Sequence, residues 1–199
     1  MFDEFMLRVK VLDVLNSTPC RKIAFVAAGM SIMGYHYRYL ADLINRCSVD
    51  IRFGTVDPSA NGEYDDKTDT LRFKSRDPGF YATNESRALI VHECTHAIID
   101  LAHPGGLVRR ADNEATAWIA ETIYRMLTGE KMTKTGDFYE SLYDVAGKAI
   151  EAAPKGPPLV IDPRAVTLIG ETLRGGDEVR AKAAGKIVPD VERMSGIPY

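Results

Sequence analysis

The chain has 199 residues, 45% of them hydrophobic, which is enough for one domain with a real core. Its formal net charge of -3 and the lack of a long basic cluster argue against a nucleic-acid binder. The apolar run at residues 23–33 is far too short to span a bilayer.

The first part of the chain has helical and then strand-like patterns. Apolar positions at helical spacing predict a helix over 3–15. Thr18-Pro19 resembles a cap followed by a first-turn proline, which favours a second helix over 19–30, although 23–27 can equally be a buried strand. A further helix is expected over 35–46.

The pattern then alternates, and this predicts strands over 49–53 and 70–74. The stretch between them, at 57–67, contains Asp-Pro, Asn-Gly and several acids, so we expect turns there. These features predict a small antiparallel sheet directly before the next helix.

That next helix, over 85–103, has a broad apolar surface and is the most informative stretch of the chain. Asn84 is a suitable cap, Glu85 favours the first turn, and Pro-Gly-Gly at 104–106 ends the helix. Helices are also expected over 111–127 and 137–152. After a Pro- and Gly-rich break, a short helix from 162 or 163 to about 175 and a polar tail complete the chain. We therefore expect one domain over 1–152, with the helix and tail of 153–199 packed on it.

The helix over 85–103 contains an H-E-x-x-H motif. His92 and His96 are four residues apart, so both can point at one metal ion from the same helix face. Glu93 lies one residue further round and can act as general base on a water bound to that ion. An apolar helix has little reason to hold these groups without a metal, because burying them unpaired is costly. The motif predicts a Zn2+ site with His92 and His96 as ligands and Glu93 as the catalytic base.

A catalytic zinc usually has three protein ligands, so a third ligand is needed. Three candidates are available: Glu114 and Glu121 on the following helix, and His103 at the end of the motif helix. His103 is seven residues from His96, about 10 Å along an unbroken helix, so it is too far to share the ion, whereas Glu114 lies in the first turn of its helix, just after a Gly-containing connection. Asp100, four residues after His96, is a candidate to orient that imidazole. Four tyrosines are candidate donors to a developing oxyanion, namely Tyr64, Tyr81, Tyr139 and Tyr143.

The motif, together with Asn113-Glu114-Ala115, resembles the gluzincin branch of zinc metallopeptidases. The string EATAWIAE at 114–121 is similar to the glutamate helix of the small ImmA/IrrE-type metallopeptidases, and the resemblance covers roughly 49–128. It implies a zincin-like α+β fold, zinc-dependent cleavage of a peptide or protein substrate, and Glu114 as the third metal ligand. Where the gluzincin pattern has an acid four residues after the ligand glutamate, this chain has Trp118.

Three further expectations concern function, the cysteines and location. The alternative to an enzyme is a catalytically silent zinc-binding domain with a regulatory or scaffolding role. Cys20, Cys47 and Cys94 are odd in number and form no C-x-x-C pair, so they are expected to be reduced and packed. With no basic signal-peptide start at residues 1–6, the sequence predicts a cytoplasmic protein without a membrane partner.

Overall fold

The computed structural model describes residues 2–58, 60–183, 190–194 and 196, and over these residues the protein is α+β. The helices are α1 (Glu4–Leu15), α2 (Thr18–Arg21), α3 (Gly34–Asn45), α4 (Asn84–Ala102), α5 (Arg110–Leu127), α6 (Asp137–Ala152) and α7 (Pro163–Ala183), with 3-10 turns η1 (Phe80–Ala82) and η2 (Ala153–Lys155). The strands are β1 (Ala24–Ala27), β2 (Met30–Met33), β3 (Asp50–Phe53), β4 (Gly62–Asp65), β5 (Thr70–Phe73), β6 (Leu107–Arg109), β7 (Leu159–Val160) and β8 (Val191–Arg193).

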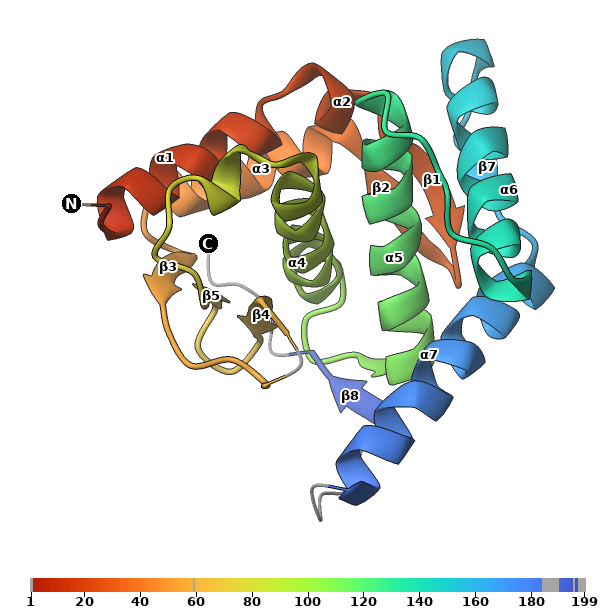
Figure 1. Cartoon of the computed structure of the whole chain (residues 1–199). Coiled ribbons are helices and arrows are strands. Elements are labelled where there is room, and N and C mark those ends of the chain that lie inside the picture. The colour runs from red at the N-terminus through yellow and green to blue at the C-terminus, as the bar shows by residue number, and fades with distance from the viewer. Residues whose placement is uncertain (1, 59, 184–189, 195, 197–199) are drawn as a thin grey trace.

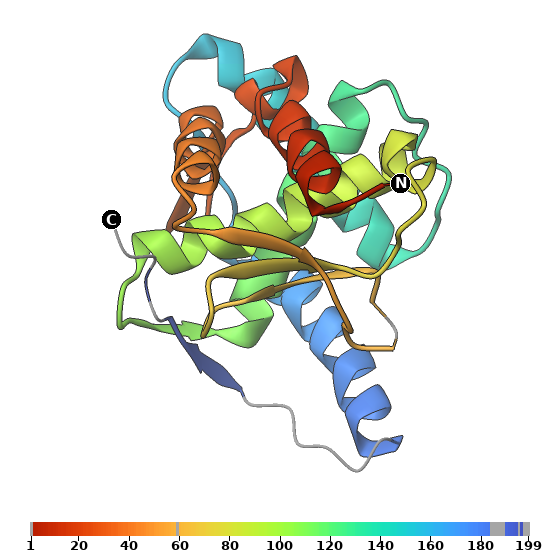
Figure 2. The ribbon, with the colours of Figure 1, turned by 90° about the vertical axis from the view of Figure 1, so that its left-hand side faces the viewer.

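Helix α4 lies at the centre of the molecule. It packs against α5 on one side and against β4 on the other, while α1 and α3 also contact it (Figure 1). The view turned by 90° shows the strands β3, β5 and β4 running alongside α4 (Figure 2). Most of α4 is buried, and its apolar residues join one hydrophobic core that also includes side chains of α1, α3 and α5. The motif helix is therefore held between the sheet and the second long helix.

The sheet beside α4 has the strand order β3-β5-β4 and is mixed, so the predicted antiparallel pairing is only half correct. Strands β3 and β5, which were predicted, pair in parallel, with Ile51 opposite Leu71. The antiparallel partner of β5 is β4, which lies inside the stretch predicted to be turns. Its sequence, Gly-Glu-Tyr-Asp, has little strand propensity, and pairing with β5 overrides that local preference.

The N-terminal half contains the clearest error of the sequence-based prediction. The predicted helix over 19–30 is only the single turn α2, and the rest forms the antiparallel hairpin β1–β2, as in the alternative strand interpretation. Ala27 pairs with Met30, so Ala28 and Gly29 form a two-residue turn, with φ of 50° and 79°. Positive φ at both positions is the type I′ geometry that matches the twist of a hairpin.

The C-terminal part is more ordered than predicted, and it packs on α5. Helix α7 continues to Ala183, beyond the predicted end near 175, and contacts both α5 and α6. Within the region predicted to be a tail, β8 pairs with β6, and Gly196 donates a backbone hydrogen bond to Asp100 on α4. The rest of the predicted tail, at 184–189, 195 and 197–199, lies outside the described residues.

The other predicted helices agree with the structure. Helices α1, α3, α4, α5 and α6 match the predicted ranges to within one residue at either end. All three cysteines are free thiols, as predicted; Cys20 and Cys94 are packed in the interior, but Cys47 is exposed, contrary to the prediction. Along the described parts of the chain, no helix combines the length and the apolar character needed to cross a membrane.

Candidate metal centre

Helix α4 positions the motif residues at the bottom of a cavity. The side chain of Thr83, rather than that of Asn84, caps the helix by accepting a hydrogen bond from the Ser86 amide. The helix ends at His103, as expected from the Pro-Gly-Gly that follows. His92 and Glu93 are almost fully buried, yet both line the cavity together with His96.

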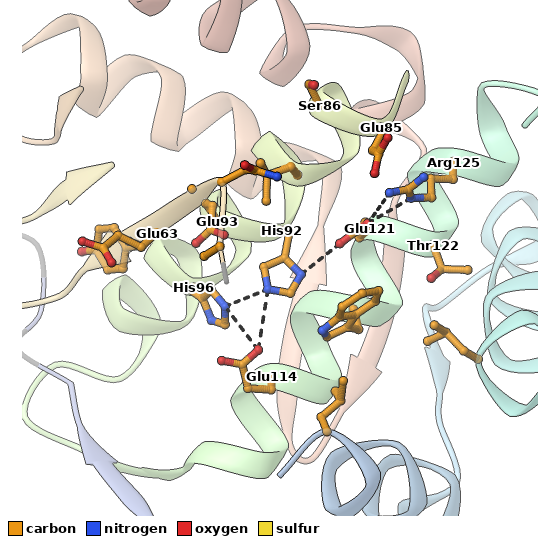
Figure 3. Close-up of a pocket in the computed structure, with 18 of the residues that line it drawn as sticks. Glu63, Glu85, Ser86, His92, Glu93, His96, Glu114, Glu121, Thr122 and Arg125 are labelled. Atoms are coloured by element: carbon orange, nitrogen blue, oxygen red, sulfur yellow. Dashed lines mark hydrogen bonds and ion pairs between the residues drawn. The ribbon is translucent and has the colours of Figure 1, made fainter. Parts of the chain in front are cut away.

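The three predicted metal ligands converge on one point (Figure 3). The Nε2 atoms of His92 and His96 are 3.2 Å apart. The Oε2 atom of Glu114, on α5, lies 3.7 Å from Nε2 of His92 and 4.0 Å from Nε2 of His96. Ligand atoms that share a tetrahedral zinc are separated by about 3.3–3.4 Å, given Zn–N bonds of about 2.0–2.1 Å. The two nitrogens lie within about 0.2 Å of this separation, and the carboxylate oxygen lies about 0.3–0.7 Å beyond it.

Each imidazole also contacts a side chain of α5 through its other nitrogen. Nδ1 of His96 is 2.8 Å from Oδ1 of Asn113. Nδ1 of His92 is buried and lies 3.1 Å from Oε2 of Glu121, which is close enough for an ion pair, although the contact is not linear enough for a hydrogen bond. Both acceptors favour a proton on Nδ1, which leaves the two Nε2 atoms facing each other with either a shared proton or a metal ion between them. Among metal ions, Zn2+ suits two imidazoles and a carboxylate.

The other two candidates for the third ligand lie elsewhere. His103 is at the C-terminus of α4, and its Nδ1 is 3.0 Å from the carbonyl oxygen of Ile99. Glu121 is on the opposite side of the His92 ring from Glu114 and contacts Nδ1, as expected for a supporting acid. Of the three, only Glu114 groups with both histidines among the described residues.

Asp100 does not have the predicted contact with His96 among the interactions described. It is fully buried and accepts hydrogen bonds from the Tyr64 hydroxyl, at 3.0 Å, and from the Gly196 amide, at 2.9 Å. The partner of His96 is Asn113, which sequence reasoning noted only as a neighbour of Glu114. Its position directly before Glu114 on α5 was the available signal, because adjacent residues at the start of one helix can reach the same site.

The charges of the site depend on one another. Burial opposes ionisation of His92, but the carboxylates of Glu114 and Glu121 outweigh burial and raise its pKa well above the ordinary value. Burial acts against ionisation of Glu114 as well, but the two histidines and Arg110 lower its pKa to about 2. At Glu93 burial prevails and raises the pKa, although both histidines and the backbone N–H of Tyr64 favour the carboxylate.

The cavity around these residues has a volume of about 1190 Å³. One wall is the edge strand β4, and the opposite wall is formed by aromatic side chains of α5 and α6. From His92, ring contacts pass to Trp118 at 5.6 Å and then to Phe138 at 6.1 Å. A cavity of this size can enclose a segment of a peptide rather than only a small ion or water.

The four tyrosines proposed as oxyanion donors differ in position. Tyr64 lines the cavity, but its hydroxyl donates to Asp69 and Asp100. The hydroxyl of Tyr81 donates to the carbonyl of Ser75. Tyr139 and Tyr143 both line the cavity and stack on each other, with ring centroids 6.1 Å apart. The structure therefore narrows the tyrosine candidates to Tyr139 and Tyr143.

No family model, curated protein or solved structure matches this chain. Its function must therefore be inferred from the site. Chemically, the site offers two imidazoles and a carboxylate arranged for one metal ion, a second buried carboxylate beside them, and a cavity large enough for a substrate.

Proposed function

We propose that the protein is a zinc-dependent hydrolase that cleaves peptide bonds, with a zincin-like arrangement of α4, α5 and the mixed sheet. The observation that carries the proposal is the convergence of His92, His96 and Glu114, with Glu93 buried next to both histidines. Three protein ligands leave a fourth position open for water or substrate, which is typical of catalytic rather than structural zinc sites.

His92, His96 and Glu114 would hold the metal. When bound, zinc supplies Lewis acidity, which lowers the pKa of a water molecule toward neutrality and polarises a carbonyl group. Among divalent ions, zinc is favoured by two imidazole nitrogens and one carboxylate oxygen in a site without cysteine ligands. Cys94, inside the motif, is fully buried and belongs to the hydrophobic core.

Glu93 has the role of general base in this proposal. Its carboxylate takes a proton from the attacking water and then delivers it to the leaving amine. The backbone N–H of Tyr64 donates to this carboxylate and so fixes its orientation from the side of β4. Burial raises the pKa of Glu93 above its ordinary value, which makes its carboxylate a stronger base.

The edge of β4 suits an extended peptide. The Lys74 amide donates to the Asn61 carbonyl, which makes that pair the hydrogen-bonded one in the antiparallel ladder. By alternation, the backbone groups of Gly62 and Tyr64 point away from β5, and both residues line the cavity. Because the Tyr64 N–H already donates to Glu93, a peptide that adds to this edge would pair with the outward backbone groups of Gly62 and the carbonyl of Tyr64, beside the proposed metal site.

At Gly62 this edge also lies close to the catalytic base. A Cβ atom there would lie 3.3 Å from Cγ of Glu93 and 3.1 Å from the ring of Phe73. Glycine therefore lets β4 lie against α4 without displacing the Glu93 side chain, and it leaves the backbone accessible to a substrate.

The test compares the wild type with Glu93→Gln. Both proteins are loaded with zinc, their metal content is measured, and cleavage of a peptide library is followed by mass spectrometry. We expect about one zinc per chain in both proteins and a loss of cleavage of at least about 100-fold in the variant. Zinc binding without cleavage of any peptide by the wild type would instead support the catalytically silent zinc-binding domain. Absence of zinc binding by the wild type would refute the metal site itself.

A further inference from the structure

Glu121 contacts the proposed metal ligand His92 on the side of the ring away from the metal site. Oε2 of Glu121 faces Nδ1 of His92 at 3.1 Å, and the Glu121 side chain is only 7% exposed. We propose that Glu121 is a positioning residue: it holds the His92 ring in the orientation and tautomer that direct Nε2 at the metal. This inference rests on the proposed metal site.

The two oxygens of Glu121 have separate partners. Oε1 accepts hydrogen bonds from Nε and Nη2 of Arg125, at 2.9 and 2.8 Å, while Oε2 faces His92 (Figure 3). Arg125 is one helical turn beyond Glu121 on α5, and this charged contact fixes the direction of the carboxylate. The carboxylate is therefore already oriented toward His92 before any ion arrives.

Arg125 is in turn fixed by a second acid. Its Nη1 donates to Oε1 of Glu130 at 2.8 Å, and the Glu130 amide donates to the Arg125 carbonyl at 3.1 Å. Glu130 thus shares Arg125 with Glu121, but among the described contacts it has none with His92. A substitution at Glu130 therefore changes the contacts of Arg125 without removing a contact of His92.

Metal binding explains why His92 needs such a partner. A neutral imidazole that offers Nε2 to a metal must carry its proton on Nδ1, and in His92 that nitrogen is buried. A buried N–H that faces no acceptor costs free energy, whereas a carboxylate beside it fixes the tautomer and makes the imidazole a stronger ligand. His96 faces a neutral amide, Asn113, so of the two histidines His92 is the one with a carboxylate behind its Nδ1.

The experiment compares Glu121→Gln with Glu130→Gln, which remove the same charge from the two partners of Arg125. Zinc affinity is measured by competition with a chromophoric chelator, and the visible absorption of the Co2+-loaded protein reports the ligand geometry. We expect Glu121→Gln to weaken zinc binding about 10- to 100-fold and to change the Co2+ spectrum. Glu130→Gln should keep the wild-type affinity and spectrum.

A third variant, Glu121→Asp, keeps the charge for Arg125 but withdraws the carboxylate from His92. It should fold and still bind zinc more weakly than the wild type, which separates positioning from a contribution to folding. Wild-type affinity and spectrum in both Glu121 variants, or equal losses in Glu121→Gln and Glu130→Gln, would overturn the role of Glu121. A wild type that binds no metal would overturn the proposed metal site, and this inference with it.

Discussion

The close crossing of α7 over the start of α5 gives a sharp test of how the fold supports the site. Gly170 on α7 lies against Ala111, three residues before Glu114. A Cβ atom at position 170 would lie 2.5 Å from the carbonyl oxygen of Ala111, whereas ordinary contacts begin at 3.4 Å. The two helices would have to separate by about 0.9 Å, the difference between these two distances. The obstructing atoms belong to the backbone, so no side-chain rotation can relieve the clash.

We expect Gly170→Ala to lower the free energy of unfolding by about 2 kcal/mol. Overpacking against a backbone costs about 3 kcal/mol, and the better helix propensity of alanine offsets about 1 kcal/mol of this. Because the displaced segment of α5 carries Glu114, zinc affinity should fall as well. Urea unfolding of the metal-free protein and chelator competition measure the two effects.

The same helix provides the control. Gly175 is exposed, and a Cβ atom there would meet nothing within 4 Å. Gly175→Ala should therefore raise the free energy of unfolding by up to about 1 kcal/mol and leave zinc affinity unchanged. If Gly170→Ala were as stable as Gly175→Ala, the packing of α7 against α5 described above would be incorrect.

Four further outcomes are expected. Because burial raises the pKa of Glu93, its ionised form destabilises the folded, metal-free protein at neutral pH. Glu93→Gln should therefore be more stable than the wild type at neutral pH, and this difference in stability should shrink as the pH falls. Thermal unfolding measured across pH tests this. Glu114→Ala should strongly weaken zinc binding while His103→Ala leaves it intact, and chelator competition giving the reverse order would exclude Glu114 as the ligand. Because nearby carboxylates raise the pKa of His92 well above its ordinary value, zinc binding at pH 7 should release about one proton. Calorimetry in buffers of different ionisation enthalpy measures the number of protons released. A value of zero would contradict a protonated His92 in the metal-free protein. Ala28→Asn should raise the free energy of unfolding in urea by about 0.5–1 kcal/mol, because asparagine tolerates the positive φ of the hairpin turn better than alanine. A loss of stability would contradict that turn geometry.

The elements that were predicted well have local signals. Helix α4 has a broad apolar surface and a clear stop in Pro-Gly-Gly, and both are properties of the sequence alone. The hairpin β1–β2 lacks the Asn-Gly or Asp-Gly turn that would have marked it, because its turn is Ala28-Gly29. A short apolar run before such a turn is equally compatible with a helix and with a strand.

Strand β4 could not be found from its own residues. Asp, Glu and Gly dominate the region, and such residues favour turns. The strand forms because its backbone pairs with β5 and because Gly62 can lie against Phe73 and Glu93, which are distant in sequence. The most important wall of the cavity therefore depends on tertiary contacts that no local pattern encodes.

The residues of the proposed site likewise include some that the sequence predicts and some that depend on tertiary contacts. The spacing of His92 and His96 on one helix predicts that they share a face, and the structure brings them together. The choice of Glu114 rested on distance along the helices, which disfavours His103, and on the resemblance to a known family. The partners of the two Nδ1 atoms depend on how α5 crosses α4, and a crossing of two helices has no signature in a single sequence.

Helix α5 supplies more of the proposed metal centre than its one metal ligand. Besides Glu114, it supplies Asn113 behind one histidine and Glu121 behind the other. A small shift of α5 relative to α4 would therefore change all three ligands at once: the carboxylate directly, and each imidazole through its Nδ1 contact. Metal affinity should consequently respond to changes at the α5–α7 contact, one helical turn before Glu114, whereas changes in the exposed turn Ala28–Gly29 of the β1–β2 hairpin should leave it unaffected.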